Sequence, residues 1–249
     1  MNQPPTDDRA AGARDLVSAA SRVTVLTGAG ISAESGVPTY RGADGLWKDF
    51  TYDDVAGPAA FARDPQRVWQ WHNERRMALK AVEPNAAHRA LAELERALTA
   101  RGGQFRLVTQ NIDGLHQAAG SRSVYELHGT ILAIRCSRCT HHRRIDFEEM
   151  EAVPSCPSCG WPMRPAIVWF GEMLPTDVWT AALEAATACD VFLSIGTSAA
   201  VYPAAGLIEM AVASGAATIE VNLEPTPAST LVDIALHGKA ARIVPQLVA

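Results

Sequence analysis

The 249-residue sequence lacks the features of a secreted, membrane-spanning or nucleic-acid-binding protein. No apolar run approaches the ~18 residues that a membrane-spanning helix needs, and the polar segment 1–14 contains no apolar core of a signal peptide. The formal net charge of −5 excludes the strongly basic character of nucleic-acid-binding domains. We therefore expect a cytoplasmic, monomeric globular protein in which residues 1–14 are flexible, with no membrane partner and no nucleic-acid partner.

Basic residues cluster only once, around the cysteine-rich part of the chain, at Arg135, Arg138, Arg143 and Arg144. In a chain of balanced charge, such a cluster is typical of a solvated rim around a small module. We expect that role here, because the rest of the sequence provides no extended basic surface.

Cysteine is scarce, and four of the five residues form two closely spaced pairs. Cys136 and Cys139 are separated by 16 residues from Cys156 and Cys159, a spacing typical of a zinc ribbon. Four thiolates complete the tetrahedral shell of Zn²⁺ and leave no open position for water, so we predict one structural zinc ion. The alternatives are two disulfide bonds or a redox pair. The remaining Cys189 is expected to be a small buried apolar residue.

Short apolar runs alternate with helical patterns and predict a parallel, doubly wound α/β sheet. Each run ends in a glycine-rich or polar cluster. Ligands of such sheets bind at the carboxyl ends of the strands, so the clusters predict one shared site. The predicted strands span 23–27, 105–109, 191–195 and 217–221, and the predicted helices span 84–100 and 203–215.

The first predicted strand runs into the turn Gly28-x-Gly30-x-x-Ala33. This pattern matches the loose dinucleotide-binding fingerprint, in which glycines let the backbone approach a pyrophosphate. A second strand with an acidic residue about 20 positions further on is missing. The turn by itself therefore leaves a nucleotide site and a plain tight turn equally open.

Taken in chain order, the motifs of this sequence resemble those of the sirtuins, which are NAD-dependent protein lysine deacylases. The resemblance extends from about residue 16 to the C-terminus. Its motifs are Gly28-Ala-Gly-Ile-Ser-Ala-Glu-Ser-Gly36, Tyr40-Arg41, Thr109-Gln-Asn-Ile-Asp113-Gly-Leu-His116, Leu127-His128-Gly129, the four cysteines, Phe170-Gly171-Glu172, Gly196-Thr197-Ser198 and Asn222-Leu223-Glu224.

The resemblance implies a single catalytic domain over residues 15–249, built on a Rossmann-like sheet. A smaller domain would consist of a helical insertion over 40–83 and a zinc-binding insertion over 130–168, with the active cleft between the two parts. NAD would be a consumed co-substrate of the reaction. The implied NAD-binding residues are Gly28, Ala29, Gly30, Glu34, Arg41, Gln110, Asn111, Ile112, Asp113, Gly196, Thr197, Ser198, Asn222, Leu223, Glu224 and Ala240.

The catalytic residues that the resemblance implies are His128, Asn111 and Asp113. In the family's reaction, the acyl oxygen of a modified lysine attacks C1′ of the nicotinamide ribose as nicotinamide leaves. His128 would relay a proton from the ribose hydroxyls, a task suited to an imidazole that titrates near neutrality. The products would be nicotinamide, O-acyl-ADP-ribose and free lysine. His88 is expected to cap a helix or lie in the core, and His116 to support the ribose-binding loop.

Two rival interpretations stay open at this point. An NAD-dependent protein ADP-ribosyltransferase would begin by breaking the same glycosidic bond. A non-catalytic NAD- or zinc-binding module would need neither His128 nor Asn111, although both are present.

Substrate recognition is expected to involve acylated-lysine proteins or peptides that pair as an added strand with extended segments at 168–171 and 201–204. The segment around Ala56 and Arg75 resembles the sirtuin branch that removes succinyl and malonyl groups, but His72 stands where that branch has Tyr. We expect His72 to donate a hydrogen bond to an acidic acyl group beside Arg75. The alternative is an acetyl or longer-acyl pocket with Arg75 on a solvated helix face. The predicted substrate-binding residues are Ala56, His72, Arg75, Val168, Phe170 and Gly171.

Overall fold

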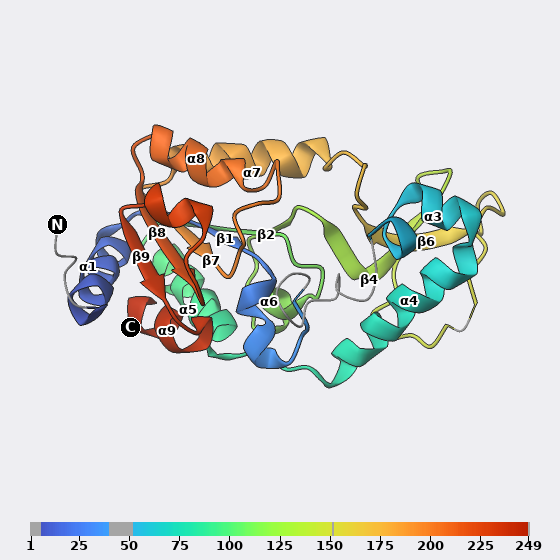
Figure 1. Ribbon diagram of the computed structural model, residues 1–249, viewed down its shortest axis with the longest axis horizontal. Coiled ribbons are helices and arrows are strands. Elements are labelled where there is room, and N and C mark those ends of the chain that lie inside the picture. Colours follow the sequence, from blue (N-terminus) through green and yellow to red (C-terminus); the bar gives the residue numbers. More distant parts are fainter. Residues whose placement is uncertain (1–5, 40–51, 151, 249) are drawn as a thin grey trace.

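The computed structural model describes residues 6–39, 52–150 and 152–248 (Figure 1). Its larger lobe is built on a six-stranded sheet with the strand order β3-β2-β1-β7-β8-β9, in which all neighbours are parallel. Numbered within the sheet, this order is 3-2-1-4-5-6, the arrangement of doubly wound dinucleotide-binding domains. The predicted Rossmann-like sheet is confirmed. The strands are β1 Arg22–Thr27, β2 Gln104–Thr109, β3 Val124–Glu126, β7 Val191–Ile195, β8 Ala217–Asn222 and β9 Ile234–His237.

Helices cover both faces of this sheet (Figure 1). α1 (Thr6–Ala19), α5 (Ala86–Ala100) and α9 (Ala240–Val248) pack on one face, whereas α7 (Thr176–Ala188) and α8 (Gly206–Ala213) pack on the other. Because helices cover both faces, the central strands are mostly buried on both sides, and apolar residues predominate in them without a strict alternation.

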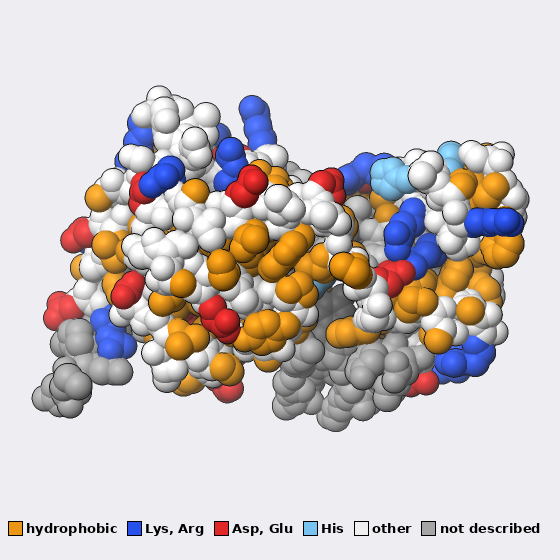
Figure 2. Space-filling view, turned by 90° about the horizontal axis from the view of Figure 1, so that it is seen from above, with side chains coloured by type: hydrophobic (Ala, Val, Ile, Leu, Met, Phe, Trp, Pro, Cys, Tyr) orange, Lys and Arg blue, Asp and Glu red, His pale blue; other side chains and the backbone are white. Residues whose placement is uncertain are grey.

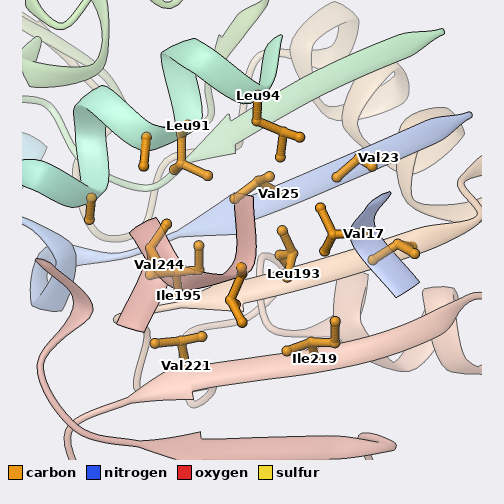
Figure 3. Close-up of a cluster of buried hydrophobic side chains, with 14 of the residues drawn as sticks. Val17, Val23, Val25, Leu91, Leu94, Leu193, Ile195, Ile219, Val221 and Val244 are labelled. Carbon is orange, nitrogen blue, oxygen red and sulfur yellow. The ribbon is translucent and has the colours of Figure 1, made fainter. Parts of the chain in front are cut away.

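The core of the first face is drawn in Figure 3, where Val25 and Leu193 of the sheet lie beneath Leu91 of α5. Helix α5 buries one apolar stripe against the strands because its Ala and Leu residues recur at helical spacing. A capping box starts the helix: the side chain of Asn85 accepts a hydrogen bond from the amide of Ala87, and His88 Nδ1 accepts one from the amide of Asn85. The helix-capping role expected for His88 is confirmed.

The N-terminal segment differs from the sequence-based expectation. We expected residues 1–14 to be flexible, and in the structure α1 begins within this segment, at Thr6. Two small apolar side chains, Ala13 and Val17, are fully buried against α9 and the sheet. This packing orders a polar segment that shows little amphipathic pattern of its own.

Two short strands and one helix boundary also differ from the prediction. β3 and β9 were not predicted, because three or four residues with polar members carry too little periodic signal. Helix α8 begins at Gly206 instead of Pro203, because residues 201–205 form a turn in which the amide of Ala205 donates to the carbonyl of Val201 over 2.9 Å. The extended segment expected at 201–204 is therefore absent, and that prediction is wrong.

The smaller lobe combines helices with a second sheet (Figure 1). Its antiparallel sheet has the order β5-β4-β6, and α4 packs against it through Trp69, which is 2% exposed. None of the helices in the described ranges is long and apolar enough to cross a membrane. The remaining elements are α2 Tyr52–Val55, α3 Pro58–Arg63, α4 Pro65–Ala78, α6 Leu115–Ala118, β4 Gly129–Cys136, β5 His142–Arg144 and β6 Met163–Ile167, with 3-10 turns at Ala29–Ile31, Ala33–Ser35, Leu79–Ala81 and Pro227–Thr230.

Candidate functional site

A cleft of about 1,600 Å³ lies at the carboxyl ends of β1, β2, β7 and β8 and extends to the smaller lobe. It is lined by every predicted NAD-, substrate-binding and catalytic residue that the structure describes. Arg41, also predicted to bind NAD, lies outside the described residues. The tertiary structure thus brings four separate sequence clusters together at the point where the strand order reverses, which is where ligands of such sheets bind.

The floor of the cleft is made of backbone packed against backbone. The amide of Gly28 donates to the carbonyl of Ile195 over 3.0 Å, and the amide of Gly30 donates to the carbonyl of Gly196 over 2.8 Å. A Cβ on Gly30 would lie 2.8 Å from Gly196 Cα, and Gly196 itself has φ +62°. These positions exclude side chains, so a ligand can approach the main chain closely.

A buried polar network fixes the segment that follows β2. The side-chain amide of Asn111 donates to the carbonyl of Gly28 over 3.1 Å and to Ser32 Oγ over 3.3 Å. Ser32 Oγ in turn donates to Asp113 Oδ2 over 2.8 Å. Burial raises the pKa of Asp113, while its hydrogen bonds from the Leu115 amide and from Ser32 oppose that rise. Sequence reasoning did not single out Ser32, although it lies inside the glycine motif.

His116 supports the segment that contains Asn111 and Asp113. Thr27 Oγ1 donates to Thr109 Oγ1 over 2.8 Å and therefore accepts from His116 Nε2 over 2.9 Å. Burial lowers the pKa of His116 well below its usual value, so the ring is neutral. The supporting role expected for His116 agrees with this geometry, because Thr109 Oγ1 also accepts from the Asn111 amide.

His128 lies between the sheet and the smaller lobe. Its Nδ1 is 3.0 Å from the carbonyl oxygen of Gln110. A carbonyl can only accept, so Nδ1 carries the proton and Nε2 keeps a lone pair. Burial lowers the pKa of His128, and the hydrogen bond to Gln110 partly opposes this. The backbone carbonyl of His128 accepts from the amide of Val168 over 2.9 Å, which joins the main chain at His128 to the segment that contains Val168.

The four paired cysteines form one cluster whose Sγ atoms all lie within 4.8 Å of one another. The sulfurs of Cys136 and Cys159 are 3.5 Å apart, and those of Cys139 and Cys156 are 3.6 Å apart. A tetrahedron with Zn–S bonds of about 2.3 Å separates its sulfurs by about 3.8 Å, whereas a disulfide bond measures about 2.05 Å. The cluster is therefore compatible with one structural zinc ion. Cys189 is buried elsewhere, under the larger sheet, as expected.

The basic side chains around this cluster have acidic or aromatic partners. Arg143 pairs with Glu148 over 2.7 Å, and Arg144 pairs with Asp146 over 2.6 Å. The guanidinium of Arg138 lies 4.7 Å from the ring centroid of the exposed Trp161. Figure 2 shows basic and histidine side chains spread over the visible face of the smaller lobe, in agreement with the expected solvated rim.

The comparisons with known proteins identify the family. A family model described as the Sir2 family matches residues 28–203. An NAD-dependent protein deacylase of Thermus thermophilus is 50% identical over 234 residues, which cover 94% of this chain and 91% of that relative. The chain belongs to the Sir2 family.

Solved structures of Sir2 proteins share the whole fold. A complex of a Sir2 homologue with NAD has a TM-score of 0.89 at 42% identity and covers 96% of this chain and 92% of that chain. A Sir2 complex with a deacetylated p53 peptide and 3′-O-acetyl-ADP-ribose has a TM-score of 0.83 at 33% identity and covers 94% of this chain and 95% of that chain. Both lobes of this Sir2 family member therefore have counterparts in the known structures.

The part of the cleft on the smaller lobe of this Sir2 protein is an apolar pocket lined by Trp71, His72, Ile131, Ile167 and Trp169, and Phe61 packs behind Trp169 in the core. The ring centroids of Phe61 and Trp169 are 5.4 Å apart, and those of His72 and Trp169 are 6.0 Å apart. The guanidinium carbon of Arg75 lies 3.4 Å from the ring centroid of Trp71, and Arg75 Nη1 donates to the Trp71 carbonyl over 2.8 Å. The rings of Phe61 and Trp169 did not figure among the predicted site residues, because aromatic spacing alone does not distinguish core from pocket.

His72 does not have the role that we expected. Its Nδ1 lies 2.8 Å from the carbonyl of Val68, one turn earlier in α4, so the Nδ1 proton is donated within the helix. Burial lowers the pKa of His72 to about 4, and Arg75 adds a smaller lowering effect. The ring is therefore neutral at neutral pH and Nε2 can only accept, so the expectation that His72 donates to an acidic acyl group is wrong.

The loop after β6 is held by a bidentate ion pair. Glu172 accepts from the Arg164 guanidinium over 2.6 and 2.9 Å and from the Trp169 amide over 2.9 Å. The Arg164 guanidinium also stacks over the Trp169 ring at 3.3 Å. The amide of Phe170 donates to the carbonyl of Ala56 over 3.2 Å, which connects the loop to α2. These contacts fix the conformation of the loop that forms one wall of the cleft, and the predicted substrate-binding residues lie along that wall.

The far end of the Sir2 cleft is formed by the loops after β7 and β8 and by the start of α9. Gln110 Nε2 donates to Thr197 Oγ1 over 3.0 Å, which joins the central loop to the β7 loop. The carboxylate of Glu34 accepts from the amide of Ala241 over 2.8 Å and so caps the start of α9. Lys239 also lines this end of the cleft, a cation that the motif pattern did not reveal.

Proposed function

We propose that this Sir2 protein is an NAD-dependent protein lysine deacylase that removes acetyl groups and releases nicotinamide, O-acyl-ADP-ribose and free lysine. The observation that carries the proposal is the orientation of His128. Its Nδ1–H is committed to the Gln110 carbonyl, so Nε2 has a lone pair in a cleft with the glycine-rich floor on one side and the apolar pocket on the other. The names of the relatives support the same conclusion.

NAD, when bound, would supply a ribose carbon that becomes electrophilic as nicotinamide leaves. The glycine floor would accept the pyrophosphate by close backbone approach. Asn111 and Asp113, which Ser32 joins, would hold the ribose and the nicotinamide in one orientation. Because this network is buried and hydrogen-bonded, it would need little reorganisation during the reaction.

His128 would act as the general base on a ribose hydroxyl. Proton uptake at Nε2 creates a positive charge on the imidazole, and the Gln110 carbonyl at Nδ1 would stabilise that charge. Asn111 and Asp113 would assist by positioning the ribose and the nicotinamide. We propose no role for zinc in the chemistry, since four thiolates would close its coordination shell.

The acylated peptide would lie along the loop that contains Val168, Phe170 and Gly171, with its acyl-lysine side chain directed into the apolar pocket. Phe170 is 40% exposed at the rim of the cleft, and an exposed aromatic residue there offers apolar contact to a peptide. We further propose that the protein is monomeric and cytoplasmic.

Removal of succinyl or malonyl groups remains a prediction that rests on Ala56 and Arg75 without a contribution from His72. His72 cannot donate, and the guanidinium of Arg75 already stacks on Trp71. An acidic acyl group would have to draw Arg75 away from that indole. We therefore propose acetyl and other uncharged acyl groups as the main substrates.

The test measures nicotinamide release from NAD with a matched pair of peptides, one acetylated at lysine and one unmodified. We expect release that requires the acetylated peptide and yields free lysine, and its loss in His128→Ala while zinc content and NAD binding persist. Mass spectrometry of the peptide separates the rival reaction. Addition of ADP-ribose to an intact acyl-lysine peptide would establish the ADP-ribosyltransferase, and NAD binding without turnover of either kind would establish the non-catalytic module.

A further inference from the structure

Glu172 closes the sequence motif at 170–172 and lines the cleft, yet the reaction proposed above gives this carboxylate no task. Its Oε1 accepts from Arg164 Nη1 over 2.6 Å and from Arg135 Nη2 over 3.3 Å. Its Oε2 accepts from Arg164 Nη2 and from the Trp169 amide, both over 2.9 Å, and from Arg135 Nη2 over 3.3 Å. Because a carboxylate oxygen has two lone pairs, this side chain is engaged within the protein and is not offered to a substrate.

The two arginines that contact Glu172 belong to neighbouring strands of the smaller sheet. Arg135 of β4 and Arg164 of β6 are register partners in the antiparallel pair, so their side chains leave the same face of that sheet. Like charges directly opposite each other destabilise a sheet, and Glu172 supplies the compensating negative charge. Burial opposes the ionisation of Glu172, but hydrogen bonds from Arg164 and from the Trp169 amide outweigh it and lower its pKa, so the carboxylate stays charged.

This cluster of charges holds the loop after β6 through both its main chain and a side chain. The amide of Glu172 donates back to the Trp169 carbonyl over 3.0 Å, which closes a turn between the two residues. The Arg164 guanidinium also lies 3.3 Å from the centroid of the Trp169 ring, and its side chain is 7% exposed. Arg135 directly precedes Cys136 of the four-sulfur cluster. The loop along which the peptide is proposed to lie is thus attached by charge to the sheet beside that cluster.

We propose that Glu172 is a positioning residue for peptide binding, which acts by holding the loop 168–172 against the two arginines. The proposal rests on the deacylase function proposed above. It separates the two substrates, because the glycine floor proposed to bind NAD is built from other contacts, such as that between the Gly30 amide and the Gly196 carbonyl. Loss of the carboxylate charge should therefore weaken binding of the peptide and spare binding of NAD.

The experiment measures KM for an acetyl-lysine peptide and the dissociation constant for NAD in Glu172→Gln, which keeps the shape of the side chain and removes its charge. We expect the peptide KM to rise at least about tenfold, because charge-assisted hydrogen bonds are lost, and NAD affinity to change by less than about twofold. A peptide KM within about twofold of the wild-type value, or an equal rise in the dissociation constant for NAD, would overturn the proposal.

Glu148→Gln is the matched control. Glu148 forms a similar two-bond ion pair with Arg143 on the same lobe, and it does not line the cleft formed by the described residues. Its substitution should leave both the peptide KM and the NAD affinity unchanged. A rise in peptide KM equal to that of Glu172→Gln would overturn the specific role of Glu172.

Arg135→Met is the second arm, and it decides the question if Glu172→Gln does not fold. The side chain of Arg135 is 44% exposed, so the substitution leaves the core intact. We expect a rise in peptide KM of about threefold, and no further rise when the substitution is combined with Glu172→Gln. An unchanged KM in Arg135→Met, or additive effects in the double variant, would overturn the shared cluster.

Hydrogen exchange provides a readout that does not depend on turnover. The backbone amides of 168–172 should exchange faster in Glu172→Gln than in the wild type, at unchanged zinc content. Unchanged exchange would contradict the positioning role. Failure of the deacylase function itself is distinguishable, because the wild type would then not turn over the acetylated peptide, while the exchange comparison would still show whether Glu172 orders the loop.

Discussion

The imidazole Nδ1 of His128 lies 3.0 Å from the backbone carbonyl oxygen of Gln110, and this contact defines which nitrogen can act as a base. A backbone carbonyl cannot be removed by a side-chain substitution, so the tautomer depends on the path of the chain after β2. The same segment carries Asn111 and Asp113, which means that one loop positions both the base and the residues proposed to hold the ribose.

The first prediction concerns pH. Burial lowers the pKa of His128 below its usual value of 6.5, so the unprotonated base persists into mildly acidic solution. We expect kcat/KM for an acetyl-lysine peptide to be flat around neutral pH and to fall only as pH decreases below 6.5, because protonation removes the lone pair. His237→Ala, at an exposed histidine of β9, should leave the profile unchanged. An acidic limb centred above 6.5 would contradict the assignment.

The second prediction concerns the cleft floor. Gly30→Ala would place a Cβ 2.8 Å from Gly196 Cα, a contact with backbone that no side-chain rotation relieves. We expect the dissociation constant for NAD, measured by titration calorimetry, to rise at least about tenfold. The melting temperature should also fall. Gly12→Ala is the matched control, because its Cβ would meet only Ile234 Cδ1 at 3.9 Å, and an alanine in α1 should be neutral or slightly stabilising.

The third prediction concerns Arg76, which is 2% exposed and ties α4 to the loop after β5. Its guanidinium donates to the carbonyls of Asp146 and Glu148 and to the side chain of Asn73. Arg76→Met keeps the apolar stem and leaves these acceptors unpaired, so we expect a loss of about 2–4 kcal/mol in the free energy of unfolding by urea titration.

Arg67→Met provides the control for Arg76, because Arg67 lies on the same helix and is exposed. Its substitution should change the free energy of unfolding by less than about 0.5 kcal/mol. Similar losses in the two variants would show that the buried guanidinium of Arg76 contributes no more to the free energy of unfolding than the exposed one of Arg67.

The fourth prediction concerns the metal. We expect about one zinc ion per chain by elemental analysis. Cys156→Ala should abolish it, because Cys156 is a buried member of the four-sulfur cluster. The apolar cluster that surrounds the sulfurs also contains Trp69 of α4, so zinc loss should lower deacylase activity and the melting temperature together. Cys189 lies outside the cluster, so Cys189→Ala should keep both the zinc and the activity.

The fifth prediction concerns acidic acyl groups. His72→Tyr replaces an acceptor by a phenol that can donate, one helical turn from Arg75. We expect desuccinylation to rise about tenfold relative to deacetylation, and Arg75→Met in that background to remove the gain. A high rate of desuccinylation in the unmodified protein would contradict our account of His72, because its Nε2 would then face a carboxylate.

Local patterns predicted the central strands and α5 well. β1, β2, β7 and β8 are mostly buried on both faces, so apolar and β-branched residues predominate in them and stand out in the sequence. Helix α1 and the short strands β3 and β9 were missed, because their order comes from packing against neighbours that lie far along the chain.

For the site, the sequence by itself determined which chemical groups are present: the glycine turn, the imidazole of His128, the four thiolates and the polar ends of the strands. Residue types and spacing encode these features directly. Only the tertiary structure decided which nitrogen of His128 and of His72 is free, because each tautomer depends on a carbonyl that the fold brings to the ring. The same reason explains Ser32 and Trp169, whose side chains contact Asp113 in the first case and Phe61 and His72 in the second, all of them far away along the chain.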